Sequence, residues 1–148
     1  MESSKENPAP PSFARVIVVD DHDLLRESLR SMLECEPDLQ IVDEAKDGKE
    51  AVELSRLHRP DLVLMDVRMP RVDGFKATRR IKEELGTTKV LIMSAYNERE
   101  YALKAIRAGA EGYILKLATV EELQEAVRGV LRGEFRYPPV SYSNQQNR

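Results

Sequence analysis

The chain has 148 residues, of which 41% are hydrophobic and 33% are charged, and its formal net charge is −3. This length fits one ordinary domain, and the small charge provides no strong field to attract nucleic acid or an anionic membrane. Cys35 is the single cysteine, which excludes an intramolecular disulfide and a cysteine-rich zinc site. No apolar signal-peptide core occurs near the N-terminus, and no apolar run approaches the roughly 18 residues that cross a bilayer. We therefore expect a soluble, cytoplasmic protein with no membrane partner.

The two ends of the chain differ in composition from its middle. Residues 1–13 are polar and rich in proline, which predicts a disordered N-terminal arm. Residues 136–148 contain Pro138 and Pro139 followed by polar residues, and they show no periodic apolar pattern. We expect one domain at residues 14–135, followed by a C-terminal tail or a truncated linker.

Within residues 14–135, short continuous apolar runs alternate with amphipathic stretches of helical period. In chain order these are a run at 16–19, a helical stretch at 25–33, a weaker run at 41–42, a helical stretch at 51–58, a run at 62–65, a helical stretch at 77–85, a run at 90–93, a helical stretch at 102–109, a run at 113–115 and a helical stretch at 123–131. Continuous apolar runs are typical of strands buried on both faces of a parallel sheet. The pattern predicts five strand–helix units with helices on both faces of the sheet.

Polar residues mark the expected ends of these helices. Asp47, Asn97 and Thr119 are each followed three residues later by glutamate, which is the pattern of a helix N-cap. Proline or glycine occupies positions where helices should stop, namely Pro37, Pro60, Gly86 and Gly109. The cap and stop signals agree with the boundaries that the apolar pattern predicts.

Chemically active side chains follow four of the five apolar runs. Asp20 and Asp21 follow the first run, Asp66 the third, Ser94 the fourth and Lys116 the fifth. Because ligands of open parallel sheets bind at the carboxyl ends of the strands, we expect these groups to meet at one edge. Each residue taken singly would be an ordinary loop residue or helix cap. Their coincidence at four strand ends favours a functional site.

The residue types indicate phosphoryl chemistry at a metal. Carboxylates held close together repel one another and raise each other's pKa, and a bound divalent cation relieves this repulsion. Mg²⁺ prefers a few carboxylates together with water and phosphate oxygens. Asp66 could then act as a nucleophile and form an acyl phosphate, while Lys116 and Ser94 contact the phosphoryl oxygens. The chain has no phosphate-binding loop of the nucleotide-binding type, so nucleotide binding is not indicated.

The sequence resembles the receiver domain of bacterial two-component response regulators. The matching stretches are VIVVDDH at 16–22, DLVLMDVRMPRVDG at 61–74, VLIMSAY at 90–96 and AGAEGYILK at 108–116. The chain is most similar to the subfamily that is usually followed by a LuxR-type helix-turn-helix output domain. The predicted fold class is accordingly α/β, a flavodoxin-like (βα)5 doubly wound sandwich with a parallel five-stranded sheet of order 2-1-3-4-5.

The resemblance implies a role for each acidic site residue. Asp66 would be the phosphoacceptor, and Asp20, Asp21 and Asp66 would bind the Mg²⁺ cofactor. The backbone carbonyl of Arg68 would be a further metal ligand. A dedicated aspartyl-phosphate phosphohydrolase, the enzymatic alternative, generally has a second aspartate two residues after the nucleophile. Arg68 stands there instead and cannot protonate a leaving group, which favours a non-enzymatic signalling switch.

The resemblance also implies the switch residues. Lys116 would pair with the phosphoryl group, Ser94 would be the switch hydroxyl and Tyr113 would be the switch aromatic. The sequence is equally compatible with a structural role, in which Tyr113 is a half-buried strand residue with its hydroxyl group in water. Many receivers carry a cis proline after the lysine, and Leu117 occupies that position here, which predicts a trans peptide or a strained loop.

The expected partners follow from this resemblance. A sensor histidine kinase would supply the phosphoryl group, and the phosphorylated protein could form a homodimer. Transcription control would need an output domain, and the residues after 132 are too few and too polar to form one. This chain alone should therefore not bind DNA specifically. The alternatives left open are a stand-alone receiver acting by protein–protein interaction and a receiver piece of a longer regulator.

Overall fold

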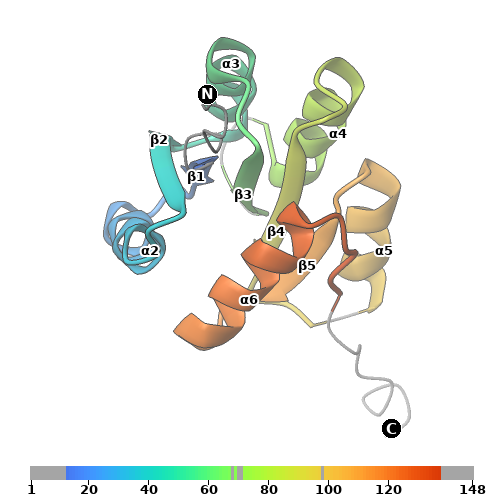
Figure 1. Ribbon diagram of the computed structural model, residues 1–148. Helices are drawn as coiled ribbons and strands as arrows, with labels where there is room; N and C mark the ends of the chain where they lie inside the picture. The colour runs from blue at the N-terminus through green and yellow to red at the C-terminus, as the bar shows by residue number, and fades with distance from the viewer. Residues whose placement is uncertain (1–12, 68, 70–71, 98, 138–148) are drawn as a thin grey trace, which may run out of the picture.

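The computed structural model describes residues 13–67, 69, 72–97 and 99–137, which form one parallel sheet flanked by helices (Figure 1). The strand order is β2-β1-β3-β4-β5, and every neighbouring pair is parallel, as the sequence predicted. The strands are β1 (Ala14–Val19), β2 (Leu39–Ala45), β3 (Leu62–Asp66), β4 (Lys89–Ser94) and β5 (Gly112–Leu115). The predicted flavodoxin-like fold class is confirmed.

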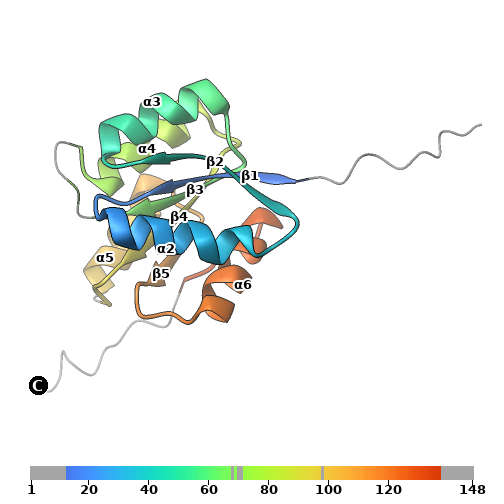
Figure 2. The same ribbon diagram turned by 90° about the vertical axis from the view of Figure 1, so that its left-hand side faces the viewer.

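Helices cover both faces of the sheet, as the side view shows (Figure 2). They are α2 (Asp23–Glu34), α3 (Gly48–His58), α4 (Gly74–Glu84), α5 (Arg99–Ala108) and α6 (Val120–Leu131). Side chains of α3, α4 and α5 join one hydrophobic core, and side chains of α2 and α6 join the other. Alternate residues of each strand point into alternate cores. Every residue of β3 is buried, which accounts for its continuous apolar sequence.

Side-chain caps fix where several helices begin, and so where the loops of the carboxyl edge end. The carboxylate of Asp47 accepts the amide N–H of Glu50 at 2.8 Å at the start of α3. Thr119 and Glu122 form the reciprocal capping box at the start of α6. The predicted cap at Asn97 stands next to residue 98, which lies outside the described residues.

The chain turns back on itself after α6. Gly133 has a φ of +95°, a left-handed conformation that glycine adopts without a steric penalty. The amide of Gly133 donates to the carbonyl of Val130 and that of Glu134 to the carbonyl of Gly129, each at 2.9 Å. This is the Schellman pattern of a helix end. Arg136 then bridges to Gly112 of β5, so the described packing continues past the predicted domain boundary at residue 135.

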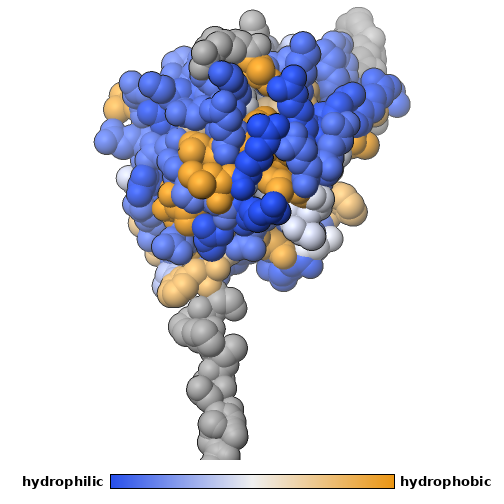
Figure 3. All heavy atoms as spheres, turned by 90° about the horizontal axis from the view of Figure 1, so that it is seen from above, coloured by the Kyte–Doolittle hydropathy of each residue, from blue (hydrophilic) through white to orange (hydrophobic). Residues whose placement is uncertain are grey.

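The face of the molecule that is seen from above is predominantly hydrophilic (Figure 3). Seen from above, charged and polar side chains interrupt the apolar patches of this face (Figure 3). None of the helices among the described residues has the length and apolar character required to span a bilayer.

Candidate functional site

The carboxyl edge of the sheet brings the predicted site residues together. Asp20 directly follows β1, Asp66 and Ser94 are the last residues of β3 and β4, and Lys116 directly follows β5. The side chains of Asp20, Asp66 and Ser94 are almost completely buried. These positions follow from the register of the parallel strands, whose carboxyl ends lie at the same edge of the sheet.

Lys116 connects the two buried carboxylates. Its Nζ lies 2.9 Å from Oδ1 of Asp66 and 3.5 Å from Oδ2 of Asp20. Oδ1 of Asp66 also accepts the amide N–H of Val67 at 2.9 Å. Oδ2 of Asp66 is buried and has no hydrogen-bond partner among the described residues. The two oxygens of Asp66 are therefore unequal, since one is held by two donors and the other is available to a ligand.

Burial sets the charge balance of this pair. Burial raises the pKa of Asp66 above its ordinary value, and repulsion from Asp20 raises it further, although the hydrogen bond from Lys116 opposes both effects. Burial lowers the pKa of Lys116, but the hydrogen bond and the charge of Asp66, together with Asp20, raise it above the ordinary value. Lys116 is thus held as a cation beside two carboxylates that crowd each other.

The donor set fits a small divalent cation. Oδ1 of Asp21 is a second buried carboxylate oxygen without a hydrogen-bond partner in the described part of the chain. Nδ1 of His22 lies 3.2 Å from this oxygen and 3.4 Å from Oδ1 of Asp20, and one ligand atom from each of these three residues lies within 4.8 Å of the others. Hard carboxylate oxygens are the ligands that Mg²⁺ prefers. Arg68, the further predicted ligand, lies outside the described residues.

The predicted switch residues form a connected chain of hydrogen bonds. Oγ of Ser94 accepts the amide N–H of Tyr96 at 3.0 Å, and the hydroxyl group of Tyr113 donates to the carbonyl of Tyr96. Tyr113 is only 1% exposed, so the alternative of a half-buried tyrosine with its hydroxyl group in water does not describe this structure. Among the described residues no peptide bond is cis, which agrees with the trans prediction for Leu117.

Two further residues support the site: Arg26, through a contact that no motif revealed, and Gly74, the last residue of the matching stretch at 61–74. The guanidinium group of Arg26 donates to the carbonyl of Asp20 at 2.7 Å and is itself held by Glu44 at 3.0 Å. The sequence did not predict the contact between Arg26 and Glu44, because Arg26 lies in α2 and Glu44 lies in β2. Gly74 donates its amide to the carbonyl of Val67 at 2.9 Å, and a Cβ at this position would lie 2.0 Å from the carbonyl oxygen of Asp66. The loop after Asp66 therefore closes only with glycine at its end.

A parallel sheet of this order, with acidic residues and a lysine gathered at its carboxyl edge, defines the class of two-component receiver domains. The chain belongs to the response regulator receiver domain family, whose model matches residues 16–128. It is 36% identical over 130 residues to the transcriptional regulatory protein DegU of Brevibacillus brevis, a match that covers 87% of this chain and 55% of DegU. The chain thus spans about half the length of that relative.

Solved structures give the same assignment. A LuxR-family two-component response regulator from Aurantimonas sp. SI85-9A1 is 39% identical, with a TM-score of 0.83 over 86% of this chain and 91% of that one. A CheX–CheY complex with BeF₃ and Mg²⁺ from Borrelia burgdorferi is 28% identical, with a TM-score of 0.75 over 79% of this chain and 88% of that one. The LuxR-family resemblance predicted from the sequence is therefore confirmed.

Proposed function

We propose that this chain is the phospho-accepting receiver of a two-component system, in which Asp66 takes a phosphoryl group from a sensor histidine kinase. The observation that carries this proposal is the buried Oδ2 of Asp66, which has no hydrogen-bond partner in the part of the chain that the structure describes, while Oδ1 is held by Val67 and Lys116. In the transfer, the bond between phosphorus and the histidine nitrogen breaks as a bond from the Asp66 carboxylate to phosphorus forms. The protein contributes position and electrostatic stabilisation rather than proton transfer.

Asp20, Asp21 and Asp66 would hold Mg²⁺, together with the backbone carbonyl of Arg68. When bound, the ion would neutralise charge on the incoming phosphoryl oxygens. The presence of Mg²⁺ together with BeF₃ in the CheX–CheY complex from Borrelia burgdorferi supports this cofactor for the fold. Lys116 already carries its charge at the same edge, so it can exchange a carboxylate partner for a phosphoryl oxygen.

Ser94 would report the presence of the phosphoryl group. Its Oγ accepts the N–H of Tyr96, which leaves the hydroxyl proton able to donate to a phosphoryl oxygen. A ligand shifts a two-state equilibrium only by the difference between its interactions with the two states. The contacts of Ser94 and Lys116 would supply this difference, and the surface around Tyr113 would change with them.

The outcome would be control of transcription, or a phosphorylation-dependent homodimer, through an output domain that belongs to a longer protein. The name of DegU as a transcriptional regulatory protein and the LuxR-family structure support this role. The match to this chain covers 55% of DegU, so the output domain would lie in a part of a longer protein that the match does not include. A stand-alone receiver that acts through a protein partner is the alternative.

The test is phosphoryl uptake from a small-molecule phosphodonor in the presence of Mg²⁺, measured by intact-mass spectrometry. We expect one phosphoryl group on the native protein and none on Asp66→Asn. Asp61→Asn is the matched control, since Asp61 precedes β3 and accepts the amide of Arg15 at 2.8 Å, at the opposite end of the strand. Normal labelling of Asp66→Asn would refute the proposal, and turnover of a simple phosphate ester would favour a phosphohydrolase instead.

A further inference from the structure

The outer edge of β5 is occupied by the chain's own segment at residues 134–137, here called the strap. The amide of Tyr113 donates to the carbonyl of Arg136 at 2.8 Å, and the amide of Arg136 donates to the carbonyl of Glu111 at 3.0 Å. The strap therefore adds a short parallel pairing to the last strand of the sheet. Unpaired strand edges attract other chains, so this pairing also protects the edge.

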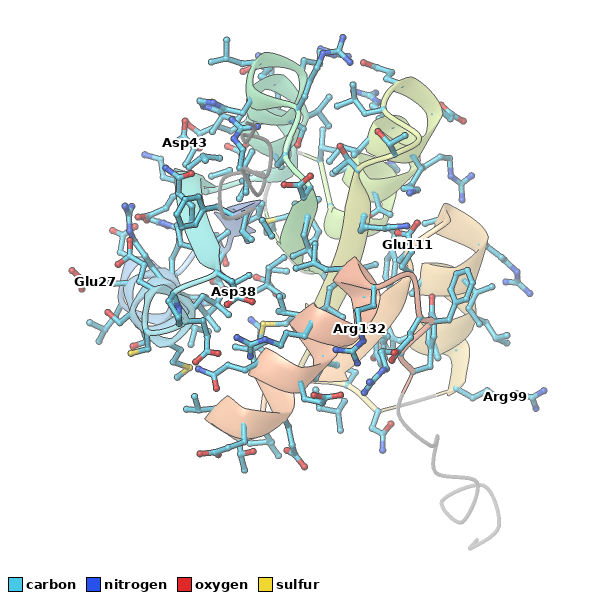
Figure 4. The ribbon with its side chains drawn as sticks, viewed as in Figure 1. Glu27, Asp38, Asp43, Arg99, Glu111 and Arg132 are labelled. Atoms are coloured by element: carbon cyan, nitrogen blue, oxygen red, sulfur yellow. The ribbon has the colours of Figure 1, made fainter. Side chains whose placement is uncertain are left out.

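Side chains anchor the strap to α6. The guanidinium group of Arg136 donates to Glu125 at 2.6 Å and to Glu134 at 2.7 Å. It lies over Gly129, where an added Cβ would come within 2.5 Å of Nε of Arg136. Arg132, labelled near the end of α6 in Figure 4, also pairs with Glu134, at 3.0 Å. Exposed ion pairs of this kind stabilise little singly, so the anchoring depends on the network and the backbone bonds.

The strap also contacts the predicted switch aromatic. The ring of Tyr137 stacks on that of Tyr113, with centroids 6.4 Å apart and planes inclined by 11°. The hydroxyl group of Tyr137 donates to the carbonyl of Ala110 at 2.8 Å, and the ring packs against the core. Aromatic pairs of this geometry attract each other in addition to the effect of their buried area. The strap is therefore more stable while Tyr113 stays buried.

A continuous series of contacts joins the strap to the phosphorylation site. Ser94 bonds to the amide of Tyr96, the carbonyl of Tyr96 accepts the hydroxyl of Tyr113, and Tyr113 stacks on Tyr137. The pocket beside this series has a volume of about 410 Å³, and Tyr113, Leu115 and Tyr137 are among the residues that line it. Loss of the strap would open this pocket and expose one face of Tyr113.

We propose that docking of the strap and burial of Tyr113 stabilise each other, so that the strap couples the phosphorylation site to the segment that leaves the domain. The inference rests on the proposed function of Asp66. Coupling between two sites is reciprocal. A phosphoryl analogue at Asp66 therefore slows opening of the strap, and a loosened strap weakens binding of the analogue by the same factor. Coupling between protein sites typically amounts to about 5-fold or more.

The experiment measures amide hydrogen exchange by NMR in the full chain, with Mg²⁺ alone and with Mg²⁺ plus beryllofluoride. The amides of Tyr113 and Arg136 report strap docking directly, because each donates across the pairing. We expect beryllofluoride to slow exchange of the Arg136 amide about 5-fold or more. We expect Tyr137→Ala to raise, by the same factor, the beryllofluoride concentration that half-saturates the site.

Phe135→Ala is the matched control, since Phe135 also lies in the strap but is 74% exposed. It should leave both quantities unchanged. A beryllofluoride-dependent chemical-shift change at the Val67 amide would show that the analogue binds. If the Arg136 amide then exchanged at an unchanged rate, and Tyr137→Ala bound beryllofluoride with the native affinity, the coupling would be overturned while the proposed function stands. No response at Val67 in the native protein would instead overturn the proposed function, and the coupling with it.

Discussion

Lys116 and Asp66 form an ion pair across the full width of β4, since Nζ lies 2.9 Å from Oδ1 although β3 and β5 are not neighbours in the sheet. The lysine thus ties the loop after the edge strand to the centre of the carboxyl edge. Two carboxylates compete for this single ammonium group, because Asp20 lies 3.5 Å from it. Among the described residues, Lys116 is therefore shared between two carboxylates at this edge.

The first prediction concerns the stability of the metal-free protein. Burial raises the pKa of Asp66, so the folded state favours the protonated form. The sign follows from linkage: this group costs stability as pH rises above the ordinary aspartate pKa of about 3.9, and the full cost is reached above the raised folded pKa. We expect Asp66→Asn to be more stable than the native protein at neutral pH. A gain of about 1 kcal/mol would raise Tm by roughly 3–5 °C.

Thermal unfolding in a chelator between pH 4 and pH 8 measures this effect. The advantage of Asp66→Asn should shrink toward the acidic end of the series. A variant that is less stable than the native protein at pH 7 would show that the bond to Lys116 outweighs burial of the carboxylate.

The second prediction concerns Mg²⁺. A ligand that binds only the folded state at 100 times its Kd stabilises by about 2.7 kcal/mol, so excess Mg²⁺ should raise Tm of the native protein. Asp21→Ala should abolish this rise, because Oδ1 of Asp21 is a buried carboxylate oxygen with no hydrogen-bond partner among the described residues. Glu27→Ala removes the same charge from the exposed surface of α2, where Figure 4 labels it, and should keep the full rise. An equal response in both variants would place the ion elsewhere.

The third prediction concerns the acid limb of stability. Hydrogen bonds from Arg30 lower the pKa of Glu44, burial opposes this, and a hydrogen bond from Arg26 lowers the pKa further. A lowered pKa gives stability that is present above the ordinary glutamate value of about 4.3 and lost as pH falls through the folded pKa. Glu44→Gln should lower the free energy of unfolding by about 1.5–3 kcal/mol at pH 7. Between pH 5 and pH 3, the variant should lose less stability than the native protein does. Urea midpoints across that range test this, and parallel curves for both proteins would contradict it.

The fourth prediction concerns the ion pair between α4 and the start of β5. Nζ of Lys82 lies 2.6 Å from Oε2 of Glu111, which Figure 4 labels, and both side chains are at least 85% buried. The other carboxylate oxygen of Glu111 accepts the amide of Val90 at 2.9 Å. Glu111→Ala should cost about 3 kcal/mol, because it removes the carboxylate partner of a partly buried ammonium group, which keeps only the carbonyls of Gly86 and Thr88 as acceptors among the described residues. Glu83→Ala, on the exposed side of α4, should change the urea midpoint little, and equal losses in the two variants would contradict the prediction.

The sheet and its carboxyl edge were predictable from sequence because each depends on short-range pattern and strand direction. Continuous apolar runs identify buried parallel strands, and parallel strands deliver Asp20, Asp66, Ser94 and Lys116 to one edge. The strap was not predictable in this way. Tyr137 follows the last periodic residue and precedes two prolines, so no apolar pattern marks it as packed. The position of the strap follows from the turn at Gly133 and from the outer edge of β5. Both are features of the folded structure that have no local pattern in the sequence.

The interior orientation of Tyr113 was likewise undetermined by pattern. An aromatic residue at this point of a strand can bury its hydroxyl group or hold it in water. The carbonyl of Tyr96, which accepts the hydroxyl of Tyr113, favours the buried orientation. The contact of Arg26 with the carbonyl of Asp20 joins groups whose spacing carries no helical or strand period.

The close approach of Gly74 to the carbonyl of Asp66 has a consequence for anyone who redesigns this domain. A single methyl group at position 74 would lie 2.0 Å from the backbone carbonyl oxygen of Asp66, the proposed phosphoacceptor. The placement of the Asp66 carboxylate therefore depends on the absence of a side chain at position 74. A combinatorial library built around the active loop should hold that codon constant, or randomise it only together with the whole turn.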